Sequence, residues 1–175
     1  MTELRLILKE FESMSDIDWF HAFCNFFREG CYLDTKSFML NLGKIIPFES
    51  RFHGSQFIEP YDKRFDKISI NPILSLSDDN QKIFSLRFYG KKFSLPVVEI
   101  MKAFKEFMIQ YNTYDGGTQL FFHPIPKEYN FTAIDVWTPE ESIKNSDVRK
   151  LKVDNIVFLF ASKLQLFRDG YSMVE

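Results

Sequence analysis

The three histidines and two cysteines are the side chains best suited to bind a metal or to carry out nucleophilic chemistry. His21 and Cys24 stand three residues apart, so a helix would place them on one face. Together with Cys31 and His53 they would supply four zinc ligands. Structural zinc sites, however, usually show paired short spacings such as C-x₂-C, and only one short pair is present here. Cys24 also lies on an apolar stripe, where cysteine behaves as a small hydrophobic residue, so neither a zinc site nor a Cys–His nucleophile is predicted.

A second arrangement with catalytic chemistry would use His123 and Asp135. His123 precedes Pro124 at the end of an expected strand, and Asp135 lies on the strand after it. A His–Asp pair across neighbouring strands could support acid–base catalysis. Any hairpin places some residue opposite a histidine, so the favoured interpretation is a strand-end histidine that binds a backbone carbonyl. A small enzyme built on this pair is kept as an alternative.

The remaining candidate motifs have structural explanations. Asp78–Asp79 belong to a predicted turn, where aspartate bonds to the local backbone, and Glu140–Glu141 to a helix start, where the dipole favours acids. Gly116–Gly117 lack the spacing of a phosphate-binding loop, and the chain contains no G-x-S-x-G or H-E-x-x-H motif. The sequence therefore predicts no catalytic residue, no metal and no cofactor, and a protein that is not an enzyme.

Length and charge narrow the class of protein further. The 175 residues predict a single globular domain over 1–175. The net charge of −2 and short, interrupted lysine clusters disfavour direct binding to nucleic acid, which usually needs a basic face. No stretch approaches the roughly 18 apolar residues of a membrane span, and the first residues lack the features of a signal peptide. We expect a cytoplasmic protein with reduced cysteines and no membrane contact.

Aromatic residues make up 17% of the chain, and 21 of them are phenylalanines. Such rings could form most of a core or could line a binding surface. The abundance of Phe, Ile, Lys and Asn favours a compositional bias over a dedicated surface.

The N-terminal part is predicted to be helical. Residues 3–13 fit a helix face better than a strand, and Ser15 can cap a second helix that stops before Gly30. A third helix is expected at Thr35–Leu42, ended by Gly43. A loop is predicted from Pro47 to about Arg64.

The hydrophobic period changes to two near Lys67. Residues 67–89 predict a β-hairpin around a turn at Ser77–Asn80, with Pro72 marking an edge strand or a break. Further strands are expected at about 118–123 and 131–137, and a terminal hairpin at 154–168, for which a single helix is the alternative.

Two helices are predicted between and after these strands. The first and strongest runs from Ser94 to Tyr111 and is followed by a loop at Asn112–Gly117. Thr138–Glu141 form a capping box for the second. Taken together, the expected helices and strands predict an α+β fold, an antiparallel β-sheet with helices packed on it.

A predicted interaction surface combines tyrosines with acidic and indole side chains at one end of this sheet. Tyrosine joins a rigid apolar ring to a hydrogen-bonding tip, which suits protein interfaces. The candidate partner-binding residues are Tyr111, Tyr114, Asp115, Glu128, Tyr129, Asp135 and Trp137. A free sheet edge, which can pair with a partner's strand, is the second option.

Three stretches resemble bacterial immunity proteins. They are the run from Asp16 to Gly30, the segment Ile45–Phe52 and the tail Val157–Gly170. Proteins of this kind accompany polymorphic toxins, particularly those of contact-dependent growth inhibition.

The resemblance implies a cytoplasmic antitoxin that binds the C-terminal domain of a cognate toxin and blocks its activity. Many such toxins are nucleases, whose basic clefts attract acidic partners, although the net charge of −2 is modest for that role. The resemblance assigns no individual site residue. The alternatives are a module that binds single-stranded nucleic acid through sheet aromatics and the small enzyme described above.

Overall fold

The computed structural model describes residues 2–28, 35–47, 56–72, 83–103, 107–114, 117–124, 133–138 and 148–159. The helices are α1 (Glu3–Glu12), α2 (Asp16–Arg28), α3 (Thr35–Leu42) and α4 (Val97–Ala103), with a 3₁₀ turn η1 (Val148–Lys150). The strands are β1 (Gly43–Ile46), β2 (Gln56–Pro60), β3 (Phe65–Pro72), β4 (Ile83–Gly90), β5 (Leu95–Pro96), β6 (Phe107–Tyr114), β7 (Gly117–Pro124), β8 (Ala133–Thr138), β9 (Lys152–Val153) and β10 (Asn155–Leu159).

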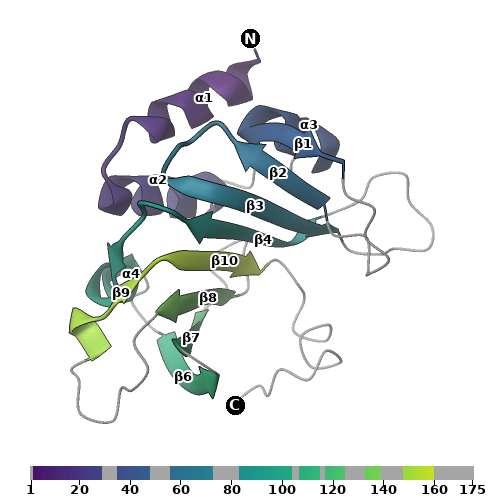
Figure 1. The fold of residues 1–175 in the computed structure, drawn as a ribbon. Helices are drawn as coiled ribbons and strands as arrows, with labels where there is room; N and C mark the ends of the chain where they lie inside the picture. The colour runs from purple at the N-terminus through teal and green to yellow at the C-terminus, as the bar shows by residue number, and fades with distance from the viewer. Residues whose placement is uncertain are drawn as a thin grey trace.

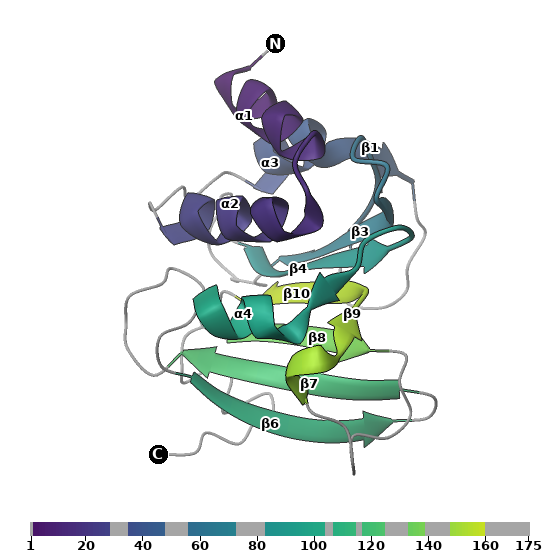
Figure 2. The same ribbon diagram turned by 90° about the vertical axis from the view of Figure 1, so that its left-hand side faces the viewer.

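The described strands form one large antiparallel sheet of eight strands and one small pair. The large sheet has the order β1-β2-β3-β4-β10-β8-β7-β6, and β5 pairs with β9. Helix α2 lies behind its central strands (Figure 1). Helices α1 and α3 stand at the β1 end, and β6 and β7 form the opposite end (Figure 2). The predicted α+β fold, an antiparallel sheet with helices packed on it, is confirmed.

The first three predicted helices are present, and two of them begin at hydroxyl caps. The Thr2 hydroxyl accepts a hydrogen bond from the Arg5 N–H at 3.2 Å, and the Ser15 hydroxyl accepts one from the Asp18 N–H at 3.2 Å. Each cap satisfies a backbone donor that the first turn leaves without a partner. The predicted stop at Gly30 lies outside the described residues.

The predicted loop from Pro47 to about Arg64 is wrong in part, because β2 occupies Gln56–Pro60 and pairs with β1 and β3. In β2 only Ile58 and Pro60 are buried. A run this short carries too little alternation to be recognised before its partners are known.

The predicted helix from Ser94 to Tyr111 is wrong at both ends, and of its described residues only Val97–Ala103 are helical. Leu95–Pro96 form β5, which pairs with β9. Residues Phe107–Tyr114 form β6, which pairs with β7 along its whole length. The predicted loop at Asn112–Gly117 is correspondingly shorter, since Tyr114 already pairs with Gly117. Aromatic and β-branched residues favour a pleated, half-buried surface, and here cross-strand pairing outweighed a helical period.

The hairpin predicted at 67–89 is confirmed as β3 and β4. Of the two interpretations of Pro72, the break is correct and the edge strand is wrong: β3 lies between β2 and β4, and its register shifts at this last residue.

The expected strands near 118–123 and 131–137 are β7 and β8, and the strand expected after residue 154 is β10, between β4 and β8. The turn at Ser77–Asn80, the helix after Thr138 and the second strand of the terminal hairpin lie outside the described residues.

The core lies between the helices and one face of the sheet and is rich in aromatic rings. The Trp19 ring centroid lies 4.6 Å from that of Phe23, 4.9 Å from that of Phe65 and 5.0 Å from that of Phe88. Ten of the 21 phenylalanines are buried among the described residues. Much of the aromatic content therefore serves packing.

Arg64 lies in the turn between β2 and β3 and joins three parts of the chain, although its side chain is only 9% exposed. Its Nη2 donates to the carbonyls of Phe11, Glu12 and Met14 at 3.0, 3.1 and 2.9 Å. These carbonyls are at the end of α1, where the helix dipole is negative and the last carbonyls need donors. Arg64 thus caps α1 from a distant turn.

Two carboxylates and two backbone amides complete this network. Arg64 Nε lies 3.0 Å from Asp62 Oδ1 and Nη1 lies 3.3 Å from Asp16 Oδ1. The Arg64 carbonyl accepts from the N–H groups of Lys91 and Lys92 at 2.9 and 3.0 Å. Burial raises the pKa of Asp62, although the hydrogen bonds and charge of Arg64 act in the opposite direction.

Replacing Arg64 by methionine is expected to lower the free energy of unfolding by about 3–5 kcal/mol, because Asp62 loses its charged partner and three helix-end carbonyls lose their donor. Chemical denaturation measures this loss. The matched control is Lys91→Met, which removes an exposed ion pair with Asp66 at 3.5 Å and should cost less than about 1 kcal/mol. Equal effects of the two substitutions would contradict a central role for Arg64.

Gly90, at the end of β4, lies against the backbone of Asp154. A Cβ added at Gly90 would stand 2.1 Å from the Asp154 carbonyl oxygen, so backbone would have to move. Gly90→Ala should therefore destabilise the protein by more than about 1 kcal/mol. The exposed Lys92→Ala control should change stability by less than about 0.5 kcal/mol in the same thermal or chemical melt.

Candidate functional site

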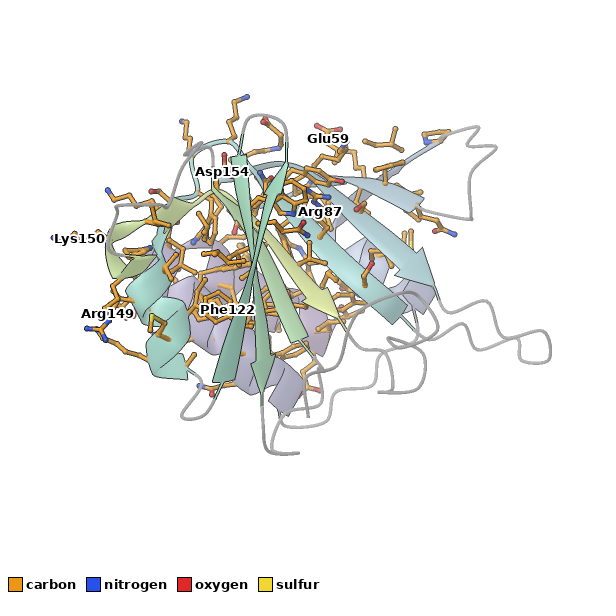
Figure 3. The ribbon with its side chains drawn as sticks, turned by 90° about the horizontal axis from the view of Figure 1, so that it is seen from below. Glu59, Arg87, Phe122, Arg149, Lys150 and Asp154 are labelled. Carbon is orange, nitrogen blue, oxygen red and sulfur yellow. The ribbon has the colours of Figure 1, made fainter. Side chains whose placement is uncertain are left out.

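The two faces of the large sheet differ in chemistry. One face carries buried apolar residues such as Leu86, Phe88 and Phe122, and packs against the helices. The other face carries Arg87 and Tyr89, which alternate with Leu86 and Phe88 along β4. Figure 3 shows Phe122 on the helix side of the sheet and Arg87 on the other side.

Five side chains on this second face form an alternating series of rings and cations, which we call the cation–ring ladder. Lys67 Nζ lies 4.9 Å from the centre of the Phe57 ring and 4.4 Å from that of Tyr89. The Arg87 guanidinium lies 4.6 Å from the same Tyr89 ring and 5.2 Å from that of Trp137. Each cation thus lies over two rings, within the distance at which cation–π attraction is effective.

Strand register explains why these residues meet. Ser69 and Arg87 are paired between β3 and β4, and Lys67 is paired with Tyr89 in the neighbouring row of the same face. Phe57 pairs with Ser69, while Tyr89 and Trp137 both pair with Asn155 of β10. All five ladder side chains are partly exposed. The ladder therefore spans β2, β3, β4 and, across β10, β8.

The ladder leaves its two positive charges without carboxylate partners among the described residues. Arg5 and Arg64, by contrast, both form ion pairs with acids. Arg87 Nε is buried and has no hydrogen-bond partner among the described residues. Rings hold a guanidinium in place without neutralising it, so the ladder presents an oriented positive charge.

Trp137, the one predicted surface residue whose side chain is described, is a member of the ladder. Asp135 stands two residues before Trp137 on β8, so both positions belong to the same face of the sheet. Asp135 pairs with Val157, which in turn pairs with Arg87. Asp115, Glu128 and Tyr129 lie outside the described residues. Their role in partner binding stays a prediction.

The two predicted tyrosines on β6 occupy different register rows. Tyr111 pairs with Leu120, which pairs with the buried Val136, so position 111 belongs to the row of the core face. Tyr114 pairs with Gly117 at the end of the hairpin. Trp137 pairs with Gln119 of β7, and Gln119 pairs with Asn112 of β6. Position 111 is therefore not in the register row of Trp137.

The alternative catalytic pair, His123 and Asp135, lies on the neighbouring strands β7 and β8. Asp135 pairs with Phe121, two residues before His123 along β7. The two positions are therefore diagonal neighbours on one face, a separation typical of about 7–8 Å rather than a direct pair.

His21 and Cys24 do not act together. His21 Nε2 lies 3.7 Å from Glu99 Oε2, and Lys102 Nζ lies 2.8 Å from Oε1 of the same carboxylate. The hydrogen bond from Lys102, aided by His21, lowers the pKa of Glu99. Cys24 is 3% exposed within the core, and burial raises the pKa of its thiol. A buried neutral thiol is a poor nucleophile and a poor metal ligand.

Among the described residues, no three His, Cys, Asp or Glu side chains gather into a group able to hold a metal ion. Within the same part of the chain, no helix has the length and apolar character needed to cross a membrane.

Sequence reasoning missed Phe57, Lys67, Arg87 and Tyr89 as site residues. The alternation along β4 already placed Arg87 and Tyr89 on one face, opposite Leu86 and Phe88. What was missing was the cross-strand register, because β2 was expected to be a loop and β10 was not known to separate β4 from β8.

Comparison of the chain with protein-family models, with curated proteins and with solved structures finds no match.

The burial of Cys24 predicts selective chemical protection. In the native protein at about pH 8, iodoacetamide should leave Cys24 unmodified, because the thiolate that reacts is strongly disfavoured. Digestion and mass spectrometry would report Cys24 separately from Cys31. The unfolded protein is the positive control, and rapid native alkylation of Cys24 would contradict its placement in the core.

Proposed function

We propose that this protein is a non-catalytic inhibitor that binds one cognate protein, of the kind that the resemblance to immunity proteins suggests. Its partner would be the C-terminal toxin domain of a contact-dependent growth inhibition effector, and the site of action would be the cytoplasm. The single observation that supports protein binding best is the cation–ring ladder.

The composition of the ladder supports this proposal. Arg87, Tyr89 and Trp137 belong to the three residue types most enriched at the energetic centres of protein interfaces. They are partly exposed and held by one another. Such side chains lose little conformational entropy on binding, because their neighbours already restrict them.

Binding of single-stranded nucleic acid is the second candidate, because aromatic residues on a sheet can stack with bases. Two features weigh against it. A cation already lies over each ladder ring, which leaves less ring surface for bases, and the chain has a net charge of −2.

Co-expression with the toxin domain encoded by the neighbouring gene tests the proposal. We expect a 1:1 complex on co-purification and restored growth of cells that make the toxin domain. Trp137→Ala and Tyr89→Ala should each weaken the complex by at least about 2 kcal/mol, since both remove a central aromatic contact.

The matched control is Tyr61→Ala, which removes an exposed tyrosine that also contacts an arginine, since the Arg5 guanidinium lies 4.4 Å from its ring centre. This change should alter affinity by less than about 0.5 kcal/mol. Recovery of only the uncomplexed 20.8 kDa chain, with no protection of growth, would contradict the proposed function.

A further inference from the structure

The charge of the ladder indicates what kind of partner surface it would bind. Lys67 and Arg87 both lie beside the Tyr89 ring, and no ion pair joins either of them to a carboxylate among the described residues. Two cations are thus held close together on a chain whose net charge is −2. The two ladder charges are thus opposite in sign to the net charge of the chain.

The neighbouring rings restrict the Arg87 guanidinium but do not neutralise its charge. Guanidinium groups bind carboxylates through paired N–H donors in a planar fork. Here Tyr89 and Trp137 restrict the position of that fork, and the buried Nε has no acceptor among the described residues. A partly desolvated cation interacts with an added carboxylate more strongly than a fully hydrated one does.

We propose that the ladder binds an acidic segment of the partner protein, with one carboxylate on Arg87 and a second on Lys67. This inference rests on the proposed function and specifies its partner. It assigns the acidic surface to the partner and the basic one to this chain, the reverse of an acidic inhibitor in a basic nuclease cleft.

A protein carboxylate fits the ladder better than a phosphate chain does. Nucleic acid binding draws on many phosphate contacts and on ring faces that stack with bases. The described ladder offers two cations, and both of them lie over its rings.

The two tryptophans allow a direct test on the full chain. Trp19 is 1% exposed in the core and Trp137 is in the ladder, so their indole N–H resonances report on different regions. A spectrum of the ¹⁵N-labelled protein would be recorded during titration with a short polyglutamate peptide and, separately, with oligothymidylate of similar length. Trp137→Phe assigns the two signals.

With polyglutamate we expect a saturable shift of the Trp137 signal, weakened by added salt, and little movement of the Trp19 signal. Arg87→Gln and Lys67→Gln should each weaken binding about tenfold or more, because each loses a charge-assisted contact. Arg87→Lys should also bind more weakly, since it keeps the charge and loses the planar fork. The control Lys92→Gln, an exposed lysine outside the ladder, should bind like the original chain.

An unchanged Trp19 signal shows that each variant is folded, and the two single variants test the site independently. The inference is overturned if polyglutamate does not shift Trp137, or if Arg87→Gln and Lys67→Gln bind as well as the original chain. A shift with oligothymidylate alone would instead make the ladder a nucleic-acid surface.

The toxin complex separates this inference from the proposed function. If the toxin domain binds both variants as tightly as it binds the original chain, the acidic-segment inference fails and the inhibitor function stands. If polyglutamate binds at the ladder but no toxin domain binds, the inhibitor function fails instead.

Discussion

The buried guanidinium of Arg64 is the interaction on which the N-terminal half of the fold depends. It binds the last carbonyls of α1, the carboxylate of Asp16 at the start of α2, and Asp62 in its own turn. Asp16 in turn accepts a hydrogen bond from the Ser94 N–H at 2.9 Å, in the link between β4 and β5. One side chain thereby fixes how the helices sit on the sheet, because it satisfies groups that burial would otherwise leave without partners.

The aromatic core packs the helices against the sheet in the arrangement that the Arg64 contacts define. Trp19 lies 5.9 Å from the Arg64 guanidinium and contacts rings from α2, β3 and β4. Phe23 reaches further across the sheet to Phe158 of β10, with ring centroids 5.8 Å apart. Ring pairs at these separations add modest attraction to a large burial of apolar surface. The polar network therefore fixes the geometry, while the rings provide most of the stabilisation.

Each central strand serves the core and the candidate site at the same time. On β4, Leu86 and Phe88 are buried against the helices, while Arg87 and Tyr89 form the middle of the ladder. A shift of register by one residue would exchange the two sets. Packing of the core face thus holds the ladder in place, and a surface supported in this way can keep uncompensated cations in a fixed position.

Local sequence determined the elements whose signals lie within a few residues. Neighbours along the chain account for the caps at Thr2 and Ser15, for the alternation along β3 and β4, and for the burial of Cys24 in the apolar stripe of α2.

Tertiary structure decided the rest. Phe107–Tyr114 became a strand because β7 pairs with it, and the short β2 formed between β1 and β3. The ladder joins residues from Phe57 to Trp137, which meet only because β10 lies between β4 and β8. Cross-strand contacts depend on sheet order and register, and a hydrophobic period along one strand carries no information about which strand lies beside it.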